Sequence, residues 1–399
     1  MQIFSDLVVL ELASVLAGPS VGQFFAELGA TVIKIENAET GGDVTRCWRT
    51  AAEPADSSVS AYFSCANWGK KSVLLNLKNQ LATKAVHQLA AKADVVIASY
   101  KAGDAEKLQM DYATLSAINP KLIYGRITGY GSKVARAGYD AVIQAESGFM
   151  YLNGAADGPP TKMPVALIDI LAAHQLKEGI LALLYARERT GKGDVVEVSL
   201  LDAALASLAN QATNLLVSGE NPKRMGSEHP NIVPYGTVFY AKHNQPLVLA
   251  VGDDRQFARL CQVLQLPGLP VKPEFKTNKA RVQNRKILLD QLTPAIANMD
   301  RGALLEALQA CHVPAGAVYD LEEVFSLPSG RQMLLHDNSV GGFAKPGVRH
   351  VAFQQAGGER VKNMAGPPEA GAHTAEILAA FTSLSPEEIS SLTENLTVF

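Results

Sequence analysis

The chain has 399 residues, of which 47% are apolar and 19% charged, and its formal net charge is -3 at pH 7. This is the composition of an ordinary globular protein of two or three domains. The slightly acidic balance argues against nucleic acid or an anionic membrane as the main partner, so we expect a small-molecule ligand.

The first residues and the cysteines indicate the compartment. The N-terminus lacks the basic segment and apolar run of a secretory signal, and no uncharged run approaches the ~20 residues that span a membrane. Cys47, Cys65, Cys261 and Cys311 are far apart and form no CxxC pair, so we expect reduced, buried thiols with neither a disulfide framework nor a zinc site. These features predict a cytoplasmic protein without a bound metal.

Short β-branched runs alternate with amphipathic stretches through the first half of the chain. The expected strands cover residues 7–12, 31–35, 72–75, 94–98, 122–127 and 195–200, and the expected helices cover 18–29, 80–93, 112–118 and a long one from Pro164 to Gly191. Such alternation predicts parallel strands joined by right-handed crossovers, in a Rossmann-like, doubly wound α/β sheet. The first turn, Ala13 to Pro19, has no GxGxxG fingerprint, although a helix N-terminus there can still receive a phosphate.

The alternation of strands and helices ends after an alanine-rich helix expected over residues 200–217. Two runs, 236–240 and 247–251, show a hairpin pattern, and helices then dominate from 255 to 311. We therefore expect a large Rossmann-like domain over residues 1–217 and a smaller α+β domain over 225–318. A C-terminal segment, 328–399, is expected to return to the large domain.

A single carboxylate, Asp169, interrupts the apolar run from Pro164 to Ala173 at the head of the long helix. Pro164 suits a first helical turn, which would place Asp169 near the positive end of a helix dipole that favours the ionised form. One interpretation is a structural ion pair with an arginine. The other is a carboxylate nucleophile that is partly shielded from water, so that it attacks a substrate.

A set of short segments, taken together and in order, resembles the class III coenzyme A transferases, the family of formyl-CoA and carnitine-CoA transferases. The resemblance covers essentially the whole chain. Its segments are 28–36 (LGATVIKIE), 42–46 (GDVTR), 67–77 (NWGKKSVLLNL), 127–131 (ITGYG), 138–140 (GYD), 187–193 (RERTGKG), 199–204 (SLLDAA) and 229–235 (HPNIVPY).

The resemblance implies that Asp169 is the nucleophile. Its carboxylate would attack an acyl-CoA, form a mixed anhydride and then an aspartyl-CoA thioester, and pass CoA to an acceptor acid by the reverse steps. Coenzyme A is then a substrate, no cofactor is bound permanently, and the acids are small, with dicarboxylic or hydroxy acids as the family-level expectation. The resemblance also implies an interlocked homodimer.

The same resemblance implies further site residues. The CoA nucleotide would lie against the first turn, Val15, Leu16 and Ala17, and its contacts would include Lys34, Lys71, Ser99, Lys101 and Arg136. Trp48 and Tyr139 are candidates for the acyl pocket. Gly252, in the segment that matches the family's glycine-rich loop, is a candidate oxyanion donor; the alternative for that segment is a helix cap with Asp253 as N-cap.

Two other functions fit the same fold. An α-methylacyl-CoA racemase needs an acid–base pair, usually with a histidine where this chain has Tyr139, and tyrosine is a poor base at neutral pH. A non-catalytic Rossmann-type binding module for CoA or a nucleotide would keep the first turn but would have no use for Asp169. Covalent adducts at Asp169 would separate transfer from both alternatives.

Overall fold

The computed structural model describes residues 2–54, 57–339, 344–358 and 360–394. The chain forms two compact units: unit 1 contains Met1–Ser147, Met163–Asn210 and Pro328–Phe399, and unit 2 contains Gly148–Lys162 and Gln211–Leu327. Unit 2 is therefore larger than the expected range 225–318. Its extra segment 148–162 is held by the Arg224 guanidinium, which donates to the carbonyl oxygens of Tyr151, Ala155 and Gly158.

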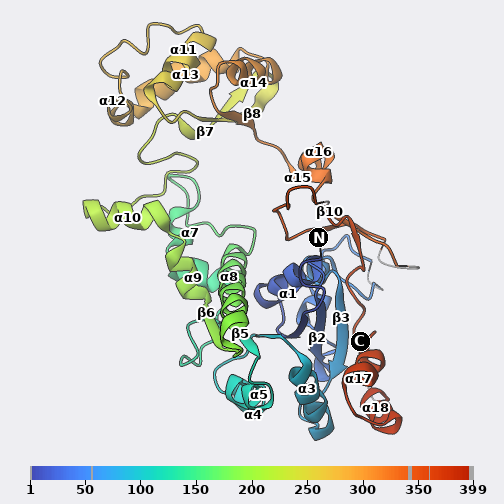
Figure 1. Ribbon diagram of the computed structural model, residues 1–399. Helices are drawn as coiled ribbons and strands as arrows, with labels where there is room; N and C mark the ends of the chain where they lie inside the picture. Colours follow the sequence, from blue (N-terminus) through green and yellow to red (C-terminus); the bar gives the residue numbers. More distant parts are fainter. Residues whose placement is uncertain (1, 55–56, 340–343, 359, 395–399) are drawn as a thin grey trace. The chain divides into compact units, whose positions relative to one another are not determined.

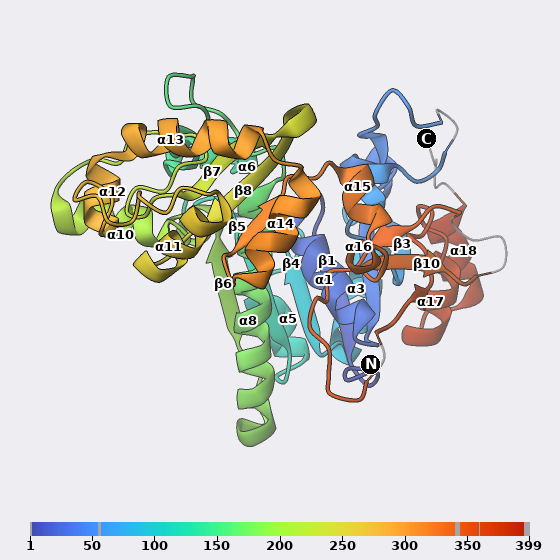
Figure 2. The ribbon, with the colours of Figure 1, turned by 90° about the horizontal axis from the view of Figure 1, so that it is seen from above.

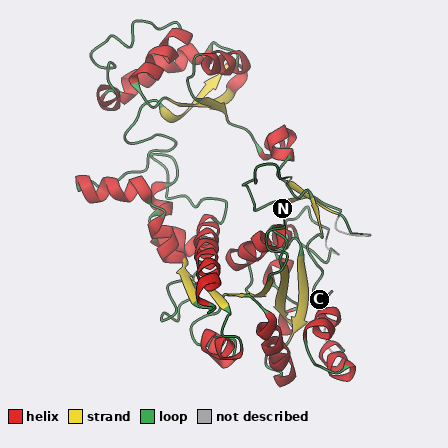
Figure 3. Cartoon of the chain, in the orientation of Figure 1, coloured by secondary structure: helices red, strands yellow, loops and turns green. Residues whose placement is uncertain are grey.

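Unit 1 is built on a six-stranded, all-parallel sheet, which confirms the predicted doubly wound α/β fold (Figures 1 and 3). Its strands are β1 (Val8–Leu12), β2 (Thr31–Asn37), β3 (Lys70–Leu75), β4 (Val95–Ala98), β5 (Ile123–Thr128) and β6 (Val195–Ser199). The strand order is β3-β2-β1-β4-β5-β6. Because the winding reverses between β1 and β4, the carboxyl ends of these two strands border a crevice, the usual ligand position in such sheets.

Helices cover both faces of this sheet (Figure 2). On one face α1 (Ala17–Glu27) packs on the first strands and α8 (Leu167–Thr190) packs on β5 and β6, and the two helices contact each other. On the other face lie α3 (Gln80–Lys92) and α5 (Tyr112–Ile118). The short helices of unit 1 are η1 (Ala38–Thr40), η2 (Val44–Cys47), α2 (Ala61–Ser64), α4 (Asp104–Lys107), α6 (Asp140–Glu146), α9 (Leu200–Ala206) and α16 (Pro328–Arg331).

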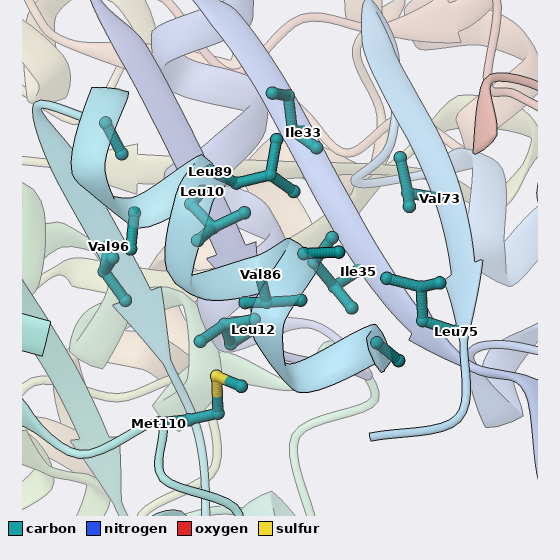
Figure 4. Packing of buried hydrophobic residues seen from close by; sticks show 14 of the residues in the cluster. Leu10, Leu12, Ile33, Ile35, Val73, Leu75, Val86, Leu89, Val96 and Met110 are labelled. Atoms are coloured by element: carbon teal, nitrogen blue, oxygen red, sulfur yellow. The ribbon is translucent and has the colours of Figure 1, made fainter. Parts of the chain in front are cut away.

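The apolar core of unit 1 lies between the sheet and α3 (Figure 4). Alternate strand residues face it: Leu10 and Leu12 from β1, Ile33 and Ile35 from β2, and Val73 and Leu75 from β3. Complete burial of each such side chain contributes roughly 1.5–3 kcal/mol. Since strand residues alternate between faces, the residues between them, Glu11 and Lys34 among them, must lie on the α1 side of the sheet.

The C-terminal segment belongs to unit 1. It forms a small sheet from β10 (Leu334–Asp337), β11 (Gly347–Val348) and β12 (Asn363–Met364), followed by α17 (Thr374–Phe381) and α18 (Pro386–Thr393). Ser385 starts α18 with a capping box that is closed by Glu388. Apolar residues of α17 and α18 complete the core around α3, which attaches the end of the chain to its beginning.

Unit 2 contains the predicted hairpin, made by β7 (Tyr235–Ala241) and β8 (Gln245–Ala250), with β9 (Ala315–Ala317) pairing antiparallel to β8. The helices around its separate apolar core are α11 (Asp254–Val263), α12 (Asn278–Gln283), α13 (Arg285–Ala297) and α14 (Arg301–Ala310). Its other helices are α7 (Phe149–Leu152), most of α10 (Ala209–Ser218), η3 (Lys242–Asn244) and α15 (Leu321–Ser326).

Three local predictions are corrected. The helix expected over residues 200–217 is broken into α9 and α10 (Ala209–Ser218), because Ala209 adopts a left-handed φ of 44°. The long helix α8 begins at Leu167, so Pro164 precedes it. Cys261 is buried as expected, but Cys47 and Cys65 are exposed. Within the described residues, no helix is long and apolar enough to cross a membrane.

Candidate active site

A pocket of about 220 Å³ opens where the strand order reverses, at the carboxyl ends of β1 and β4. We call it the switch-point pocket. It is lined by residues 14–17, 99–102, 127–129, 131, 134, 136–140, 169 and 200. Within one pocket the fold thus brings together several predicted site residues: Val15, Leu16, Ala17, Ser99, Lys101, Arg136, Tyr139 and Asp169. In a doubly wound sheet this is the position from which a ligand is bound.

The turn from β1 to α1 forms one wall of this pocket. Val15 adopts a φ of 72°, which is uncommon for a β-branched residue. Gly18 allows α1 to approach β1 closely, since a Cβ on Gly18 would lie 2.4 Å from the Ala13 Cβ. No side chain of the described residues caps the start of α1, so its first N–H groups and the positive end of its dipole are available to an anion.

Asp169 lies in the first turn of α8, with only 8% of its surface exposed. Ala166, at the N-cap position, has no capping side chain, and Asp140 of α6 takes over that role. Its Oδ1 accepts hydrogen bonds from the backbone N–H groups of Ile168 at 2.8 Å and Asp169 at 3.4 Å. The Gln144 amide donates to the other Asp140 oxygen at 2.6 Å. The backbone that carries Asp169 is thereby fixed by a second carboxylate.

The protonation of Asp169 differs from the sequence-based expectation. Burial, and then the charge of Asp140, raise the pKa of Asp169 from 3.8 to about 7. We predicted that the dipole of α8 would favour the ionised form, but desolvation outweighs it here. A carboxyl group with a pKa near neutrality can give up its proton when a substrate arrives and is weakly solvated once ionised, which suits a nucleophile.

Two aromatic candidates lie in different settings. Tyr139 is 59% exposed and lines the switch-point pocket. Trp48 is 40% exposed and makes an edge-to-face contact with Tyr62, with ring centroids 5.1 Å apart. Burial, and then the charge of Asp169, raise the pKa of Tyr62 to about 12. Tyr62 is therefore within electrostatic reach of Asp169, and Trp48 contacts Tyr62.

The basic candidates separate into three groups. Lys101 and Arg136 line the switch-point pocket, and Arg136 holds Glu146 through two hydrogen bonds of 2.5 and 3.1 Å. Lys71 lies in β3 and pairs with Glu376 of α17 at 3.4 Å. Lys34 requires a correction as a phosphate contact, because it has no exposed surface and its ammonium group is ion-paired inside the protein.

Gly252 lies in unit 2, between β8 and α11. Its N–H donates to the Gln256 side-chain oxygen at 2.7 Å, and Asp253 caps α11 by accepting from the Gln256 N–H, also at 2.7 Å. The predicted helix cap at Asp253 is therefore confirmed. The N–H of Gly252 is occupied in this arrangement, and an oxyanion would have to displace the Gln256 amide.

A second cavity, of about 430 Å³, lies at the carboxyl ends of β1, β2, β3 and β4 and was not predicted from the sequence. We call it the strand-end cavity. It shares Ser14, Ser99 and Tyr100 with the switch-point pocket and is also lined by Asn37, Asn76 and Lys78. Asn37 ends β2, and Asn76 and Lys78 follow β3. That position was the available signal, because ligands of such sheets bind at strand ends. Asp140 was also missed as a partner of Asp169, although it ends the Gly-Tyr-Asp segment.

Comparisons with known proteins agree with this geometry. Residues 4–374 match the model of CoA-transferase family III. A succinate–glutarate CoA-transferase of Agrobacterium fabrum is 38% identical over 388 residues, which cover 95% of this chain and 96% of the relative. A succinyl-CoA:glutarate CoA-transferase of Mus musculus is 36% identical, with 93% of this chain and 84% of the relative covered.

Solved structures give the same result. A crystal structure of a CAIB/BAIF family protein from Brucella suis has a TM-score of 0.79 and 37% sequence identity, covering 94% of this chain and 98% of that one. A crystal structure of Rv3272 from Mycobacterium tuberculosis has a TM-score of 0.81 and 29% identity, with the same coverage. Fold and sequence thus agree, and the chain belongs to CoA-transferase family III.

Proposed function

We propose that this protein transfers coenzyme A between an acyl-CoA and a small carboxylic acid, with Asp169 as the nucleophile. The observation that carries the proposal is the buried Asp169 carboxyl group in the switch-point pocket, which it shares with the turn at the start of α1. A non-catalytic binding module needs the turn but not a carboxyl group with a raised pKa.

The reaction follows from the chemistry of a carboxylate and a thioester. The Asp169 carboxylate attacks the thioester carbonyl, a mixed anhydride forms, and the CoA thiolate leaves. The thiolate attacks the aspartyl carbonyl, which releases the donor acid and leaves an aspartyl-CoA thioester. The acceptor carboxylate attacks that thioester, and the departing thiolate then attacks the acceptor carbonyl of the new anhydride, restoring Asp169. Covalent catalysis of this kind divides one difficult exchange into easier steps and conserves the thioester.

In this proposal coenzyme A occupies the switch-point pocket and the strand-end cavity. We place its diphosphate against the N–H groups of Leu16 and Ala17 at the start of α1, with Lys101 and Arg136 nearby in the pocket wall. The nucleoside end would occupy the strand-end cavity, where Lys78 is the basic residue that sequence reasoning missed. Ser99 lines both cavities. Lys71 stays a peripheral candidate because it is paired with Glu376.

The acyl group would lie beside Asp169, with Tyr139 and Trp48 as wall residues. Gly252, whose N–H is bonded to Gln256 within unit 2, stays an oxyanion candidate through the family resemblance alone. A preorganised oxyanion donor typically contributes ~3 to 4 kcal/mol to the transition state. We also propose an interlocked homodimer, on the strength of the family resemblance. For the acids we propose short dicarboxylates, because similar proteins are named for succinate, glutarate, oxalate and mesaconate.

Trapping the intermediates tests the proposal. The protein is incubated with succinyl-CoA, treated with hydroxylamine or borohydride, digested, and analysed by mass spectrometry. Hydroxylamine should convert an activated Asp169 to a hydroxamate, and borohydride should reduce it to an alcohol. Free CoA with succinate in place of the thioester is the control and should leave Asp169 unmodified. Modification of another carboxylate, with Asp169 unchanged, would contradict the assignment.

A further inference from the structure

Buried charges of unit 1 gather on the sheet face opposite the core of Figure 4. Glu11 of β1 lies beside Lys34 of β2 in the strand register, and the two form an ion pair of 2.9 Å. Lys34 forms a second ion pair of 2.9 Å with Asp43, and Lys70 of β3 pairs with Glu11 at 2.7 Å. All four side chains are almost completely buried. Taking such charges out of water is costly, so their placement calls for a reason.

The reason we find is the turn between β1 and α1. The Lys34 ammonium donates to the Ala13 carbonyl oxygen at 2.7 Å. The Asp43 carboxylate accepts from the Val15 N–H at 3.2 and 3.3 Å. The two charged groups therefore hold the backbone on both sides of Ser14 while they hold each other.

The turn needs such a constraint. Val15 has a φ of 72°, where a β-branched side chain is strained and from which a free chain would relax. Relaxation would move Leu16 and Ala17, the residues that begin α1 and line the switch-point pocket. The hydrogen bond to Asp43 opposes it, because the Val15 N–H points at a carboxylate that has little freedom to follow.

Asp43 also fixes the segment before Trp48. Its Oδ1 accepts hydrogen bonds from the Thr45 N–H at 3.0 Å and the Thr45 hydroxyl at 2.8 Å, capping η2. Val44 and Cys47 of η2 line the strand-end cavity. One carboxylate thus positions parts of the walls of both cavities.

We propose that the buried Lys34–Asp43 pair is a positioning device that keeps the β1–α1 turn in the conformation that binds coenzyme A. The inference deepens the proposed function and rests on it, since it takes CoA as the ligand of that turn. Both residues belong to the wall of the strand-end cavity, and neither lines the switch-point pocket that holds Asp169. Lys34, which the sequence suggested as a phosphate contact, acts on the ligand through the backbone of Ala13.

The electrostatics of the Lys34–Asp43 pair keep both partners charged. Burial alone would lower the pKa of Lys34, but the charges of Glu11 and Asp43 outweigh it and raise that pKa. Burial would raise the pKa of Asp43, but the Lys34 charge and the Thr45 hydrogen bonds outweigh it and lower that pKa. Both groups therefore remain charged around neutral pH.

The test first replaces Asp43 and then removes the backbone strain at Val15 with a second substitution. In Asp43→Ala, Lys34 keeps Glu11 and the Ala13 carbonyl as partners, so the buried ammonium is not left alone. We expect the Kd for CoA and the KM for succinyl-CoA to rise about tenfold or more, with a smaller change in kcat because Asp140 fixes Asp169 independently. Adding Val15→Gly should restore much of the affinity, because glycine adopts a positive φ without strain.

Glu27→Gln is the matched control. Glu27 is a buried carboxylate at the far end of α1 that accepts from the His350 and Val351 N–H groups. Its loss should lower stability and leave the Kd for CoA unchanged. A purely structural role for Asp43 would give the same result as Glu27→Gln and no rescue by glycine, and either finding would overturn the inference.

A measurement on the unmodified protein guards against misfolding of the variants. The Val15 amide should exchange slowly with deuterated solvent, when read at single-residue resolution by mass spectrometry, although it borders a pocket. Fast exchange would overturn the inference. Two results together would support both proposals: Asp169→Asn loses transfer, and Asp43→Ala raises the Kd for CoA as predicted. An unchanged Kd in Asp43→Ala, with transfer still dependent on Asp169, would refute only the positioning role. A folded wild-type protein that fails to bind CoA would refute both.

Discussion

Replacing Asp169 by asparagine should make the protein more stable while it abolishes transfer. The carboxyl pKa of Asp169 is raised from 3.8 to about 7 in the folded chain. A difference of about three pH units, at about 1.4 kcal/mol each, makes the ionised carboxylate cost the native state about 4 kcal/mol. Asparagine has nearly the same shape and does not ionise, so it removes that cost.

The sign of the pH dependence follows from proton binding. Between about pH 4 and pH 7 the native state holds a proton on Asp169 that the unfolded chain has released, so stability falls as the pH rises through this window. The advantage of Asp169→Asn should therefore be about 4 kcal/mol at pH 8 and shrink to about 1.5 kcal/mol at pH 5. Because the comparison is a difference between two pH values, any pH-independent effect of the amide cancels.

The assay is urea denaturation of the wild type and Asp169→Asn at both pH values. Asp6→Asn serves as the control, since Asp6 is an exposed carboxylate, and its effect on stability should be small. Equal effects of Asp169→Asn on stability at pH 5 and pH 8 would refute the reasoning about burial.

Three further predictions concern other residues. Asp140→Asn should lower the pKa of Asp169 and move the acidic limb of the kcat/KM profile to lower pH, because the charge of Asp140 contributes to the raised value; a limb that stays in place would contradict this. Tyr139→Phe should cost less than about tenfold in transfer, whereas loss of a general acid or base costs about 10² to 10⁴, and the acyl α-carbon should take up no solvent deuterium. Gly22→Ala should destabilise the protein by roughly 3 kcal/mol in denaturation assays, since its Cβ would lie 1.9 Å from the Glu11 carboxylate. The stabilisation usual for a helical glycine-to-alanine change would show that this estimate is wrong.

The sequence predicted those elements that depend on a pattern within a short stretch of the chain. The alternation of strand and helix predicted the doubly wound sheet, and the helix over residues 112–118 has the bounds that were expected. The hairpin of unit 2 was also predicted, because β7 and β8 are neighbours in the chain. Asp169 was a candidate nucleophile because it is the one carboxylate in an otherwise apolar run at the start of a helix.

Properties that depend on distant residues could not be predicted. Lys34 in a strand has the same sequence pattern whether its ammonium reaches solvent or meets Glu11 and Asp43 inside the protein. The pKa of Asp169 depends on burial by the whole unit and on Asp140, which lies 29 residues earlier in the chain. Segment 148–162 joins unit 2 through the hydrogen bonds of Arg224, which no local pattern indicates.

Oxygen transfer to Asp169 tests the central claim most directly. Acceptor succinate labelled with ¹⁸O in both carboxyl groups is mixed with the protein and an unlabelled acyl-CoA. After turnover, the mass of the peptide that contains Asp169 is measured by mass spectrometry. In the proposed route the bridging oxygen of the second anhydride comes from the acceptor and stays on the aspartate when CoA departs with the acyl group. We predict that the Asp169 carboxyl group gains ¹⁸O. Product CoA ester formed in full, with no label on Asp169, would contradict the account.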